Sequence, residues 1–422
     1  MKKLIVFVFA FSCSFSAFSQ LSINECYSKA KENYPLIKQY DLIDNSKDYN
    51  LSNAGKAYLP QITFSAKATY QSDVTKLPID LSQTGIQGMN IPALNKDQYG
   101  ATIDLNQIIW DGGAIRSKKK NIRTSSEIEK KSLDVDLYSI NERVNQVFFG
   151  ILLFDAQIGQ NKLYQDELQR NYNKIVSCIQ NGMANQADLD AIKVEQLKAK
   201  QTESQLFHTR KAYIEILSAL IGEEINSNTT LIKPETLLFI NTNIQRPELE
   251  LFQARMKNLE MQNQEINTRL MPRLGIFATG GYGRPGLNML ENEFSAYYIA
   301  GVNVSWNLSN LYSHKNNKQK IQSDVLSVRA QQETFVFNTN MDISQKQSEI
   351  NKYRDLLKYD DEIIALRSSI KQSSEAKMAN GTISGTDLMR DVYAEQSARQ
   401  DKIRHEIEML LAMYNLKWII KK

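Results

Sequence analysis

A nine-residue motif that occurs twice constrains the fold of this 422-residue chain more than any other feature. The first copy, NGMANQADL, occupies residues 181–189, and the second, NGTISGTDL, occupies residues 380–388, at an offset of 199 positions. Each copy interrupts a long segment that otherwise has the composition of a helix. An Asn-Gly pair tolerates the positive φ with which helices commonly end. The sequence therefore predicts two long helical hairpins with their turns at equivalent positions.

Proline positions show that the segments before the hairpins repeat as well. None of the eight prolines falls within 93–233 or 286–422, and both tracts are free to form long helices because proline breaks helix interiors. Two proline pairs have the same internal spacing of 25 and are offset by 212: Pro35 with Pro60, and Pro247 with Pro272. Since the later segments match at an offset of 199, the difference, 212 − 199 = 13, indicates an insertion in the first copy.

These matches indicate an internal duplication, which defines the expected organisation of the chain. A first repeat at 20–233 and a second at 234–422 each run in the order helix, strand, loop, strand, long helix, turn, long helix. The loop at 71–98 holds the insertion, and we expect it to lie outside the cell.

The first 19 residues are expected to be a secretory signal peptide. They have a basic start, an apolar run far shorter than the ~20 residues of a spanning helix, and small residues ending at Ser19. Cys13 offers an alternative as a lipidation site. Only Cys26 and Cys178 remain in the mature chain, which is too few for a disulfide framework. The chain is therefore expected to be exported without covalent cross-links.

Four segments carry a period-two alternation that is typical of strands. In 62–70 the apolar side chains occupy every second position, and similar alternation occurs at 102–110 and 296–306, whereas the strand around Ile276 is less regular. Transmembrane barrels have such strands, but a half-buried soluble sheet alternates in the same way. Four strands cannot close a barrel, for which about eight is the minimum. A membrane barrel would therefore require several chains.

The long helices carry a coiled-coil pattern. In the first half the apolar or seam positions step by three and four: Leu137, Ile140, Val144, Val147, Ile151, Phe154, Ile158, Asn161, Gln165, Leu168, Tyr172, Ile175 and Ile179. The second half repeats the pattern more weakly at Ile343, Ile350, Tyr353, Leu357 and Ile364. A single helix over 115–178 would be roughly 96 Å long.

The duplicated strand pair, the stretch QIIWDGG at 107–113 and the paired Asn-Gly turns together resemble the TolC family of outer-membrane efflux proteins. The resemblance implies a mainly α fold with a small membrane β part: a homotrimer in which helical hairpins form a periplasmic α-barrel and four strands per chain form one shared 12-stranded β-barrel. It also implies a periplasmic adaptor and an inner-membrane pump as partners. The second half departs from the pattern, because Asn310-Leu311-Tyr312 replaces Asp111-Gly112-Gly113.

Asp188 and Asp387 are candidates for an aperture at the hairpin tips. Each fits the first turn of a helix, where the dipole favours an acid, and a plain helix start explains both. Three copies of each could instead form carboxylate rings that repel anions. TolC-like channels have an aspartate constriction at this place, and Asp387 matches its first acid. Arg390 replaces the second, so pairing of Asp387 with Arg390 between chains is a possible variation.

Other candidate residues follow from the same resemblance and from the strand pattern. The tip residues are expected to contact the adaptor: Gly182, Met183, Ala184, Gly381, Thr382 and Ile383. Trp110 and Trp306 end strands, as membrane-interface aromatics do. Lys67 and Asp104 lie on polar strand faces, so a barrel would place both in its lumen. The opposite, apolar face of the strands would then contact outer-membrane lipid.

The sequence carries no signature of an enzyme, cofactor site or metal site. The three histidines lack ligand spacing, and GYGRPG at 281–286 is expected to be a loop, because a proline and a strand follow it instead of a helix. The formal charge of +4 gives no reason to expect nucleic acid. The longest basic cluster, Lys118 to Lys120, fits a solvated helix face.

The expected function is a passive duct in the cell outer membrane, with a long periplasmic extension, that exports small molecules in a tripartite efflux system. The outer-membrane component of a type I protein-secretion system is the alternative within transport. A periplasmic coiled-coil tether is the alternative from another class, and it would need neither alternating strands nor repeated tips.

Overall fold

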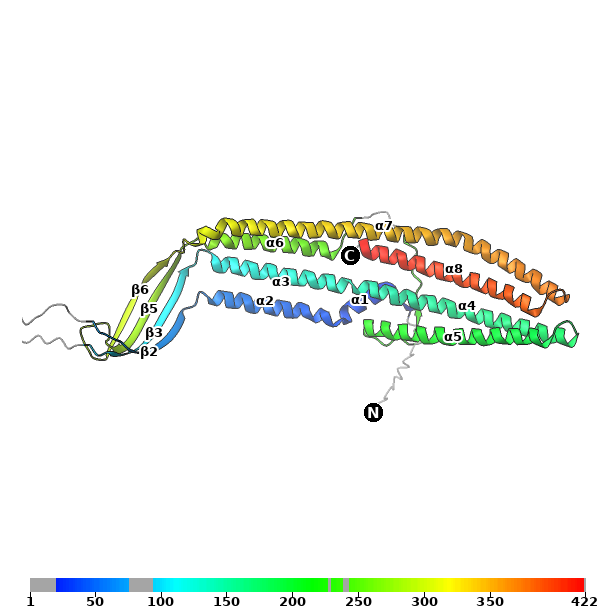
Figure 1. The fold of residues 1–422 in the computed structure, drawn as a ribbon, viewed down its shortest axis with the longest axis horizontal. Helices are drawn as coiled ribbons and strands as arrows, with labels where there is room; N and C mark the ends of the chain where they lie inside the picture. The colour runs from blue at the N-terminus through cyan, green and yellow to red at the C-terminus, as the bar shows by residue number, and fades with distance from the viewer. Residues whose placement is uncertain (1–19, 76–93, 227–228, 238–242, 421–422) are drawn as a thin grey trace, which may run out of the picture. The chain divides into compact units, whose positions relative to one another are not determined.

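The computed structural model describes residues 20–75, 94–226, 229–237 and 243–420, and the chain divides into two compact units (Figure 1). Unit 1 comprises the chain up to Lys38 together with 133–249 and 333–422, and unit 2 comprises 39–132 and 250–332. The expected signal peptide, Cys13 and most of the inserted loop lie outside the described residues. Each unit takes segments from both halves of the chain, and the proposed division at residue 233 stays a prediction.

Unit 2 contains an antiparallel sheet whose described strands are adjacent in the order β2, β3, β5, β6 (Figure 1). The strand bounds are Gln61–Tyr70, Asp97–Trp110, Arg273–Arg284 and Ser295–Ser305. Phe64 pairs with Ile103, Ile103 with Gly280, and Gly280 with Tyr298. Because directly opposite residues share a face, this register gathers the apolar positions of all four strands on one face.

The apolar face of the sheet is exposed in the chain. Ile62, Phe64, Val302 and Val304 are 66–70% exposed. The opposite face carries Thr63, Asp104 and Thr279 in one row, although Phe277 and Ile299 interrupt its polarity. The predicted alternation is therefore confirmed for β2, β3 and β6.

The end of β5 corrects one expectation. Residues 281–284 were expected in a loop, but they continue the strand, with Gly281 paired to Tyr297 and Gly283 to Ser295. A Cβ at Gly281 would lie 2.4 Å from the Tyr297 ring, so a larger residue there would displace that ring. The glycine-rich segment is thus a strand whose small residues accommodate neighbouring aromatic rings.

The helices of unit 2 follow the strand order. They are α2 (Gln39–Lys56), α3 (Ala114–Tyr138), α6 (Pro247–Thr268) and the first part of α7 (Asn310–Ala379). Lys130 of α3 contacts Asp44 of α2 at 2.7 Å, Asn258 of α6 donates to Asn121 of α3 at 2.9 Å, and Arg255 of α6 donates to Gln331 of α7 at 3.5 Å. The helices therefore lie in the order α2, α3, α6, α7. This is the order of the strands to which they connect, β2, β3, β5 and β6.

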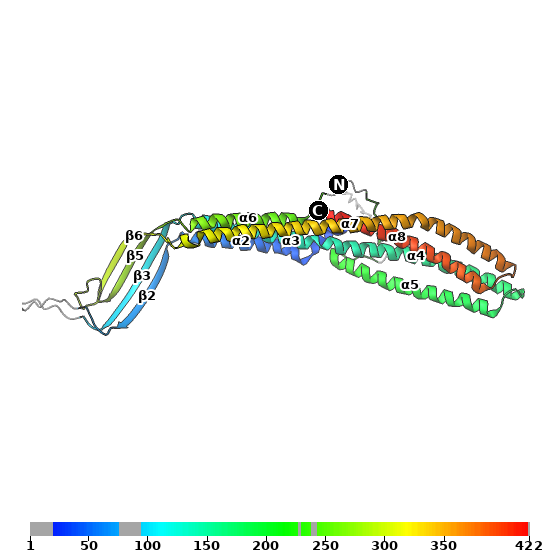
Figure 2. The same cartoon turned by 45° about the horizontal axis from the view of Figure 1, so that its top comes forward.

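Unit 1 consists mainly of two long hairpins (Figure 2). The first joins α4 (Ile140–Gln180) to α5 (Gln186–Ile221), and the second joins the rest of α7 to α8 (Gly385–Ile420). Smaller elements complete the unit: α1 (Ile23–Asn33), the 3-10 helix η1 (Pro35–Lys38), and the parallel pair β1 (Gln20–Leu21) and β4 (Thr230–Leu231).

The coiled-coil seams are confirmed, and the helix considered over 115–178 is divided by one residue, Ser139, whose backbone stays in the right-handed helical region. Every seam position predicted in the first half is buried or half-buried, including Val144 and Leu168 at 0% exposure. Ile343 and Ile350 pack in a core with residues of α8 such as Leu416. Within the described part of the chain, no helix combines the length and apolarity needed to cross a lipid bilayer.

Candidate functional site at the hairpin tips

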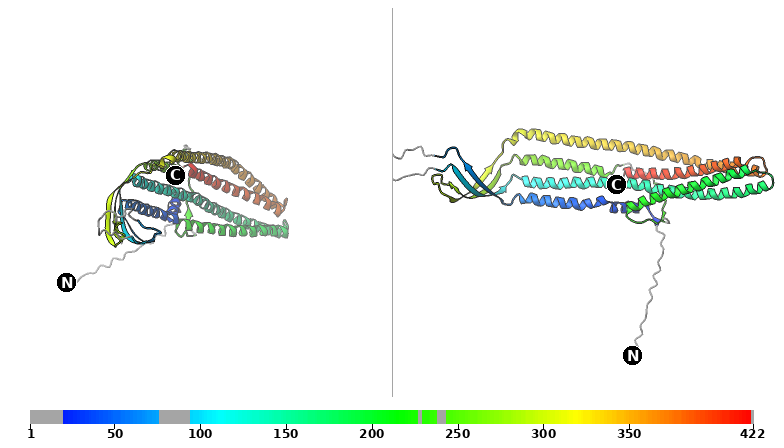
Figure 3. Two further views of the ribbon diagram at one scale, coloured as in Figure 1. Left: turned by 60° about the vertical axis from the view of Figure 1, so that its left-hand side comes forward. Right: turned by 60° about the horizontal axis from the view of Figure 1, so that its bottom comes forward.

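The two hairpin turns lie at the same end of unit 1 (Figure 3), and they have the same backbone geometry, as the motif repeat predicts. Gly182 has φ +72° and Gly381 has φ +68°. Met183 donates its backbone N–H to Cys178 O, and Thr382 donates to Lys377 O, each at 2.9 Å. A Cβ at either glycine would meet no atom within 4 Å, so glycine is needed there for its φ and not for space.

Each turn leads into a helix that is capped by its own residues. The Asn185 side chain accepts from Asp188 N and the Asp188 side chain accepts from Asn185 N, both at 3.1 Å. Ser384 Oγ accepts from Asp387 N at 3.1 Å. The predicted positions of Asp188 and Asp387 in the first turns of α5 and α8 are therefore confirmed.

Asp188 also joins the two hairpins. Its Oδ1 accepts the backbone N–H of Gly385 at 2.7 Å, at the start of α8, and its side chain is buried. A Cβ at Gly385 would lie 2.8 Å from Asp188 Cβ and 2.7 Å from Ile175 Cδ1, so only glycine permits this approach. Within one chain Asp188 thus caps two helices. This role is structural, whereas the sequence suggested a role at an aperture, which stays a prediction.

Asp387 remains available at the tip. Hydrogen bonds from the Ser384 side chain and backbone lower the pKa of Asp387. Arg390 Nη1 lies 3.8 Å from Asp387 Oδ1 in the same chain, and the Arg390 side chain is 74% exposed. The two residues therefore form a loose surface pair within one chain, and the pairing between chains considered above stays a prediction.

The six expected adaptor-contact residues fall into two groups. Gly182, Met183, Gly381 and Thr382 are exposed. Ala184 and Ile383 are half-buried against a core that includes Ile175, Ile192 and Leu388. The first group forms the free surface of the two turns, and the second anchors the turns to the helices beneath them.

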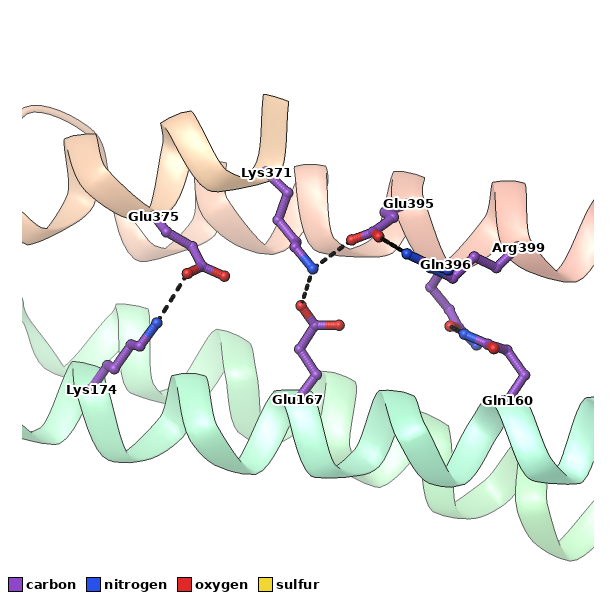
Figure 4. Close-up of polar contacts among 8 residues, drawn as sticks. All are labelled: Gln160, Glu167, Lys174, Lys371, Glu375, Glu395, Gln396 and Arg399. Atoms are coloured by element: carbon purple, nitrogen blue, oxygen red, sulfur yellow. Dashed lines mark hydrogen bonds and ion pairs between the residues drawn. The ribbon is translucent and has the colours of Figure 1, made fainter. Parts of the chain in front are cut away.

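A row of polar contacts joins α4 to the second hairpin (Figure 4). Gln160, Glu167 and Lys174 are seven residues apart and lie on one stripe of α4. Gln160 donates to Gln396 at 2.8 Å, Glu167 accepts from Lys371 at 2.6 Å, and Lys174 donates to Glu375 at 3.0 Å. Together with Asp188 at the tip, this polar stripe fixes the two hairpins of one chain against each other.

Lys371 is the centre of the polar stripe. Its Nζ also lies 2.5 Å from Glu395, which Arg399 contacts at 2.5 Å (Figure 4). Burial alone would raise the pKa of Glu395, but the hydrogen bonds from Lys371 and Arg399 outweigh it and lower that pKa. Burial likewise opposes the rise in the pKa of Lys371, which its two carboxylate partners cause. The network therefore holds its charges through the neutral pH range.

The expected lumen residues of the sheet share one face. Lys67 lies over Gly100, and Asp104 accepts from Thr279 Oγ1 at 2.6 Å and from Thr102 Oγ1 at 3.2 Å. The register places Lys67 and Asp104 opposite the apolar face.

Trp110 lies on the apolar face at the end of the sheet that adjoins the helices, and Trp306 directly follows β6 at the same end. The register shift between Ile108 and Trp110 turns Trp110 onto that face beside Leu274. Trp306 donates its Nε1–H to Leu270 O at 2.9 Å. Both rings are about half exposed or more, at 47% and 60%.

Sequence reasoning missed the polar stripe. The spacing of seven between Gln160, Glu167 and Lys174 was visible, as was the spacing of four between Glu395 and Arg399. Both patterns also occur on solvated helix faces, and only the fold shows that α4 packs against α8.

Comparisons with known proteins agree with this geometry. The family model described as outer membrane efflux protein matches residues 26–223. A search of curated proteins finds no match. Among solved structures, a membrane protein from Pseudomonas aeruginosa has a TM-score of 0.69 at 11% identity, covering 94% of this chain and 90% of that one. The Campylobacter jejuni CmeC outer membrane channel has a TM-score of 0.64 at 12% identity, covering 94% and 85%.

The open state of the Neisseria gonorrhoeae MtrE outer membrane channel has a TM-score of 0.65 at 12% identity, covering 94% of this chain and 88% of that one. At such identities the structural matches establish the fold, and the family model supplies the relationship in sequence. The match over residues 26–223 relates the first half of the chain to the outer membrane efflux protein family, and the structural matches show that the chain has the fold of these outer-membrane channels.

Proposed function

We propose that this protein is the outer-membrane duct of a tripartite efflux system, which passes small molecules from an inner-membrane pump and its periplasmic adaptor to the exterior. One observation carries the proposal: the apolar face of the four-stranded sheet is largely exposed, and the same chain forms long helical hairpins. An exposed apolar face of this kind is unstable in water and suits a lipid environment.

The edges of the sheet favour a shared barrel. Among the described strands, β2 pairs only with β3 and β6 only with β5, so both edges have unpaired backbone groups. Lipid cannot satisfy such groups. Because successive strands are antiparallel and four in number, β2 and β6 run in opposite directions. The β6 of one copy can therefore pair antiparallel with the β2 of the next, and three copies give 12 strands.

Two aromatic belts support the membrane position. Tyr99, Tyr282 and Tyr298 lie on the apolar face at the loop end, Trp110 lies on it at the helix end, and Trp306 directly follows β6 at that end. Tyr298 and Trp306 are eight residues apart, about 26 Å along the strand. An apolar band of about 25 Å between aromatic girdles is typical of outer-membrane barrels. In this position Lys67 and Asp104 face the lumen.

The hairpin tips supply the proposed contacts with partners. The four exposed turn residues, Gly182, Met183, Gly381 and Thr382, form the adaptor contact, since their small or flexible side chains permit close approach. Three copies of Asp387 and Arg390 surround the aperture. The proposed cargo is small molecules. Protein export in a type I secretion system is the alternative, because the same architecture serves both.

The test is the mass and activity of the detergent-extracted native protein. We expect light scattering to give three chains, negative-stain images to show threefold symmetry, and planar bilayers to show discrete conductance. A strain lacking the gene should accumulate dye substrates and regain efflux on complementation. A monomer without conductance would leave four strands unable to close and would exclude the duct. Normal small-molecule efflux combined with loss of a secreted protein would favour the secretion role.

A further inference from the structure

Four segments of unit 2 adjoin the helix end of the sheet, and all four lack acidic residues. They are the end of α2 with its linker (49–60), the start of α3 (114–126), the end of α6 with its linker (266–273) and the start of α7 (310–323). They hold 47 residues without one Asp or Glu. The whole chain has 47 acidic residues among 422, about one in nine, so a stretch of this size would ordinarily hold about five.

The same four segments hold eleven cations, which we name the basic collar: Lys56, Arg116, Lys118, Lys119, Lys120, Arg123, Arg269, Arg273, Lys315, Lys318 and Lys320. Lys119, Lys120 and Lys318 are half-buried, and the other eight are exposed. Sequence reasoning took Lys118 to Lys120 for an ordinary solvated face. The fold brings that triplet to the same level as cations from the other three segments.

The cations of the basic collar are largely uncompensated. Among the described residues, Arg269 pairs with Glu265 at 3.3 Å, and it is the one member of the collar with an ion pair. Lys120 contacts the neutral side chain of Gln264 at 3.5 Å. Carboxylates return farther from the sheet: Glu127 on α3 pairs with Lys257, and Asp44 on α2 pairs with Lys130. Two carboxylates adjoin the collar: Asp111, buried between β3 and α3, accepts from Ile115 N–H, and Glu265 of α6 accepts from Asn121 of α3 at 3.2 Å.

Apolar and aromatic side chains lie between the basic collar and the sheet. Trp110 and Trp306 end the apolar face, and Leu59, Leu311 and Tyr312 are exposed beside them at 56%, 55% and 87%. This order, from an apolar band through aromatic rings to Lys and Arg, matches the order of environments across a bilayer interface, from acyl chains to headgroups. Two independent features, charge and aromaticity, thus point to the same boundary.

We propose that the basic collar binds the anionic headgroups of the membrane leaflet that surrounds the helix end of the sheet, with phosphatidylglycerol-like phosphates as ligands. The inference rests on the membrane position proposed above and adds a lipid-binding surface to it. Charge complementarity supports this occupant, since cations within a Debye length of an anionic surface are attracted to it, and the eleven cations of the collar far outnumber the two adjoining acids, Asp111 and Glu265.

Native mass spectrometry of the whole assembly, released from nanodiscs of equal phosphatidylglycerol and phosphatidylethanolamine, tests the proposal. The variant replaces five exposed collar residues: R116Q, K118Q, R123Q, K315Q and K320Q. The matched control replaces the same residue types, also exposed, in unit 1: K162Q, R170Q, K193Q, K200Q and R367Q. We expect the wild type and the control to retain phosphatidylglycerol selectively. In the collar variant, the ratio of retained phosphatidylglycerol to phosphatidylethanolamine should fall roughly tenfold.

Equal selectivity in the variant and the control would overturn the proposal. A changed anion preference of the conductance, with lipid retention unchanged, would also overturn it, because the collar would then line the conduit. Assembly mass is measured first, and if the fivefold variant does not assemble, the smaller variant K315Q/K318Q/K320Q replaces it. A wild type that neither assembles nor conducts counts against the duct, whereas a conducting wild type without lipid selectivity counts against the collar alone.

Discussion

At the residue scale, two aspartates at equivalent positions perform different tasks. Asp188 is buried and accepts from Asn185 N and Gly385 N, whereas Asp387 caps only its own helix and stays partly exposed. The two turns therefore share the same helix start and differ in what the carboxylate contacts. One acid fastens the hairpins together, and the other is free to act at an aperture.

Replacing Asp188 with Ala should destabilise the hairpin tips by about 2 kcal/mol, because the buried Gly385 N–H and the part-buried Asn185 N–H lose their acceptor. Asp188→Asn, which keeps one acceptor oxygen, should cost less. The midpoint of thermal unfolding in detergent measures both. Asp387→Ala is the control and should shift the midpoint less than Asp188→Ala does. Equal shifts for the two alanine variants would remove the special role of Asp188.

Lys371→Met should remove about 3 kcal/mol at neutral pH, since the buried Glu395 loses a charged partner. The pKa of Glu395 is lowered in the folded state, so its stabilising contribution is complete above the usual glutamate range near 4.3 and disappears as pH falls through the lowered value. The difference between wild type and variant should therefore shrink in acid. Urea titrations at neutral and acid pH measure it.

Lys174→Met is the matched control for that experiment. Its pair with Glu375 lies on the same stripe of α4, but the Lys174 side chain is 56% exposed. Exposed pairs contribute little, so this variant should be close to wild type at every pH. A deficit for Lys371→Met that does not change with pH would show that lost packing, and not the charge network, causes it.

At the scale of elements, the hairpins depend on two positive-φ glycines. Gly182→Ala and Gly381→Ala should each cost about 1–2 kcal/mol, because alanine is strained at this φ. No neighbouring atom would obstruct the added methyl group, so the cost should be equal at the two sites. Asn, which tolerates the left-handed region, should be milder. Hydrogen exchange at the tips measures the effect, and a large asymmetry between the sites would indicate packing that the single chain does not show.

Much of this level of structure could be predicted from sequence. The Asn-Gly turns, the first-turn aspartates, the seams and the strand faces depend on local chemistry and periodicity, and the structure confirms each. The break at Ser139 carries no proline or glycine signal, so periodicity alone predicted one helix. The second acceptor role of Asp188 and the partners of Lys371 depend on the packing of segments about 200 residues apart, which no local pattern encodes.

At the scale of the whole molecule, the proposed duct requires the two faces of the sheet to meet different environments. Val302→Lys should cost about 2–4 kcal/mol if that face meets lipid at mid-depth, whereas Asn303→Lys, one residue later on the polar face, should be tolerated. The yield of folded protein in isolated outer membranes and its resistance to urea measure the difference. Equal tolerance at both positions would contradict the assignment of the faces.

The equal lengths of the hairpin arms have a consequence for how such a chain can change over time. α5 and α8 each have 36 residues, and their bounds differ by the same 199 positions that separate the two turns. A deletion within α5 alone would therefore move its contacts out of step with those of α4 and shorten one hairpin relative to the other. Heptad-sized length changes should survive only when all four arms change together, while the loops of the sheet remain free to vary, as the 13-residue insertion in the first half already illustrates.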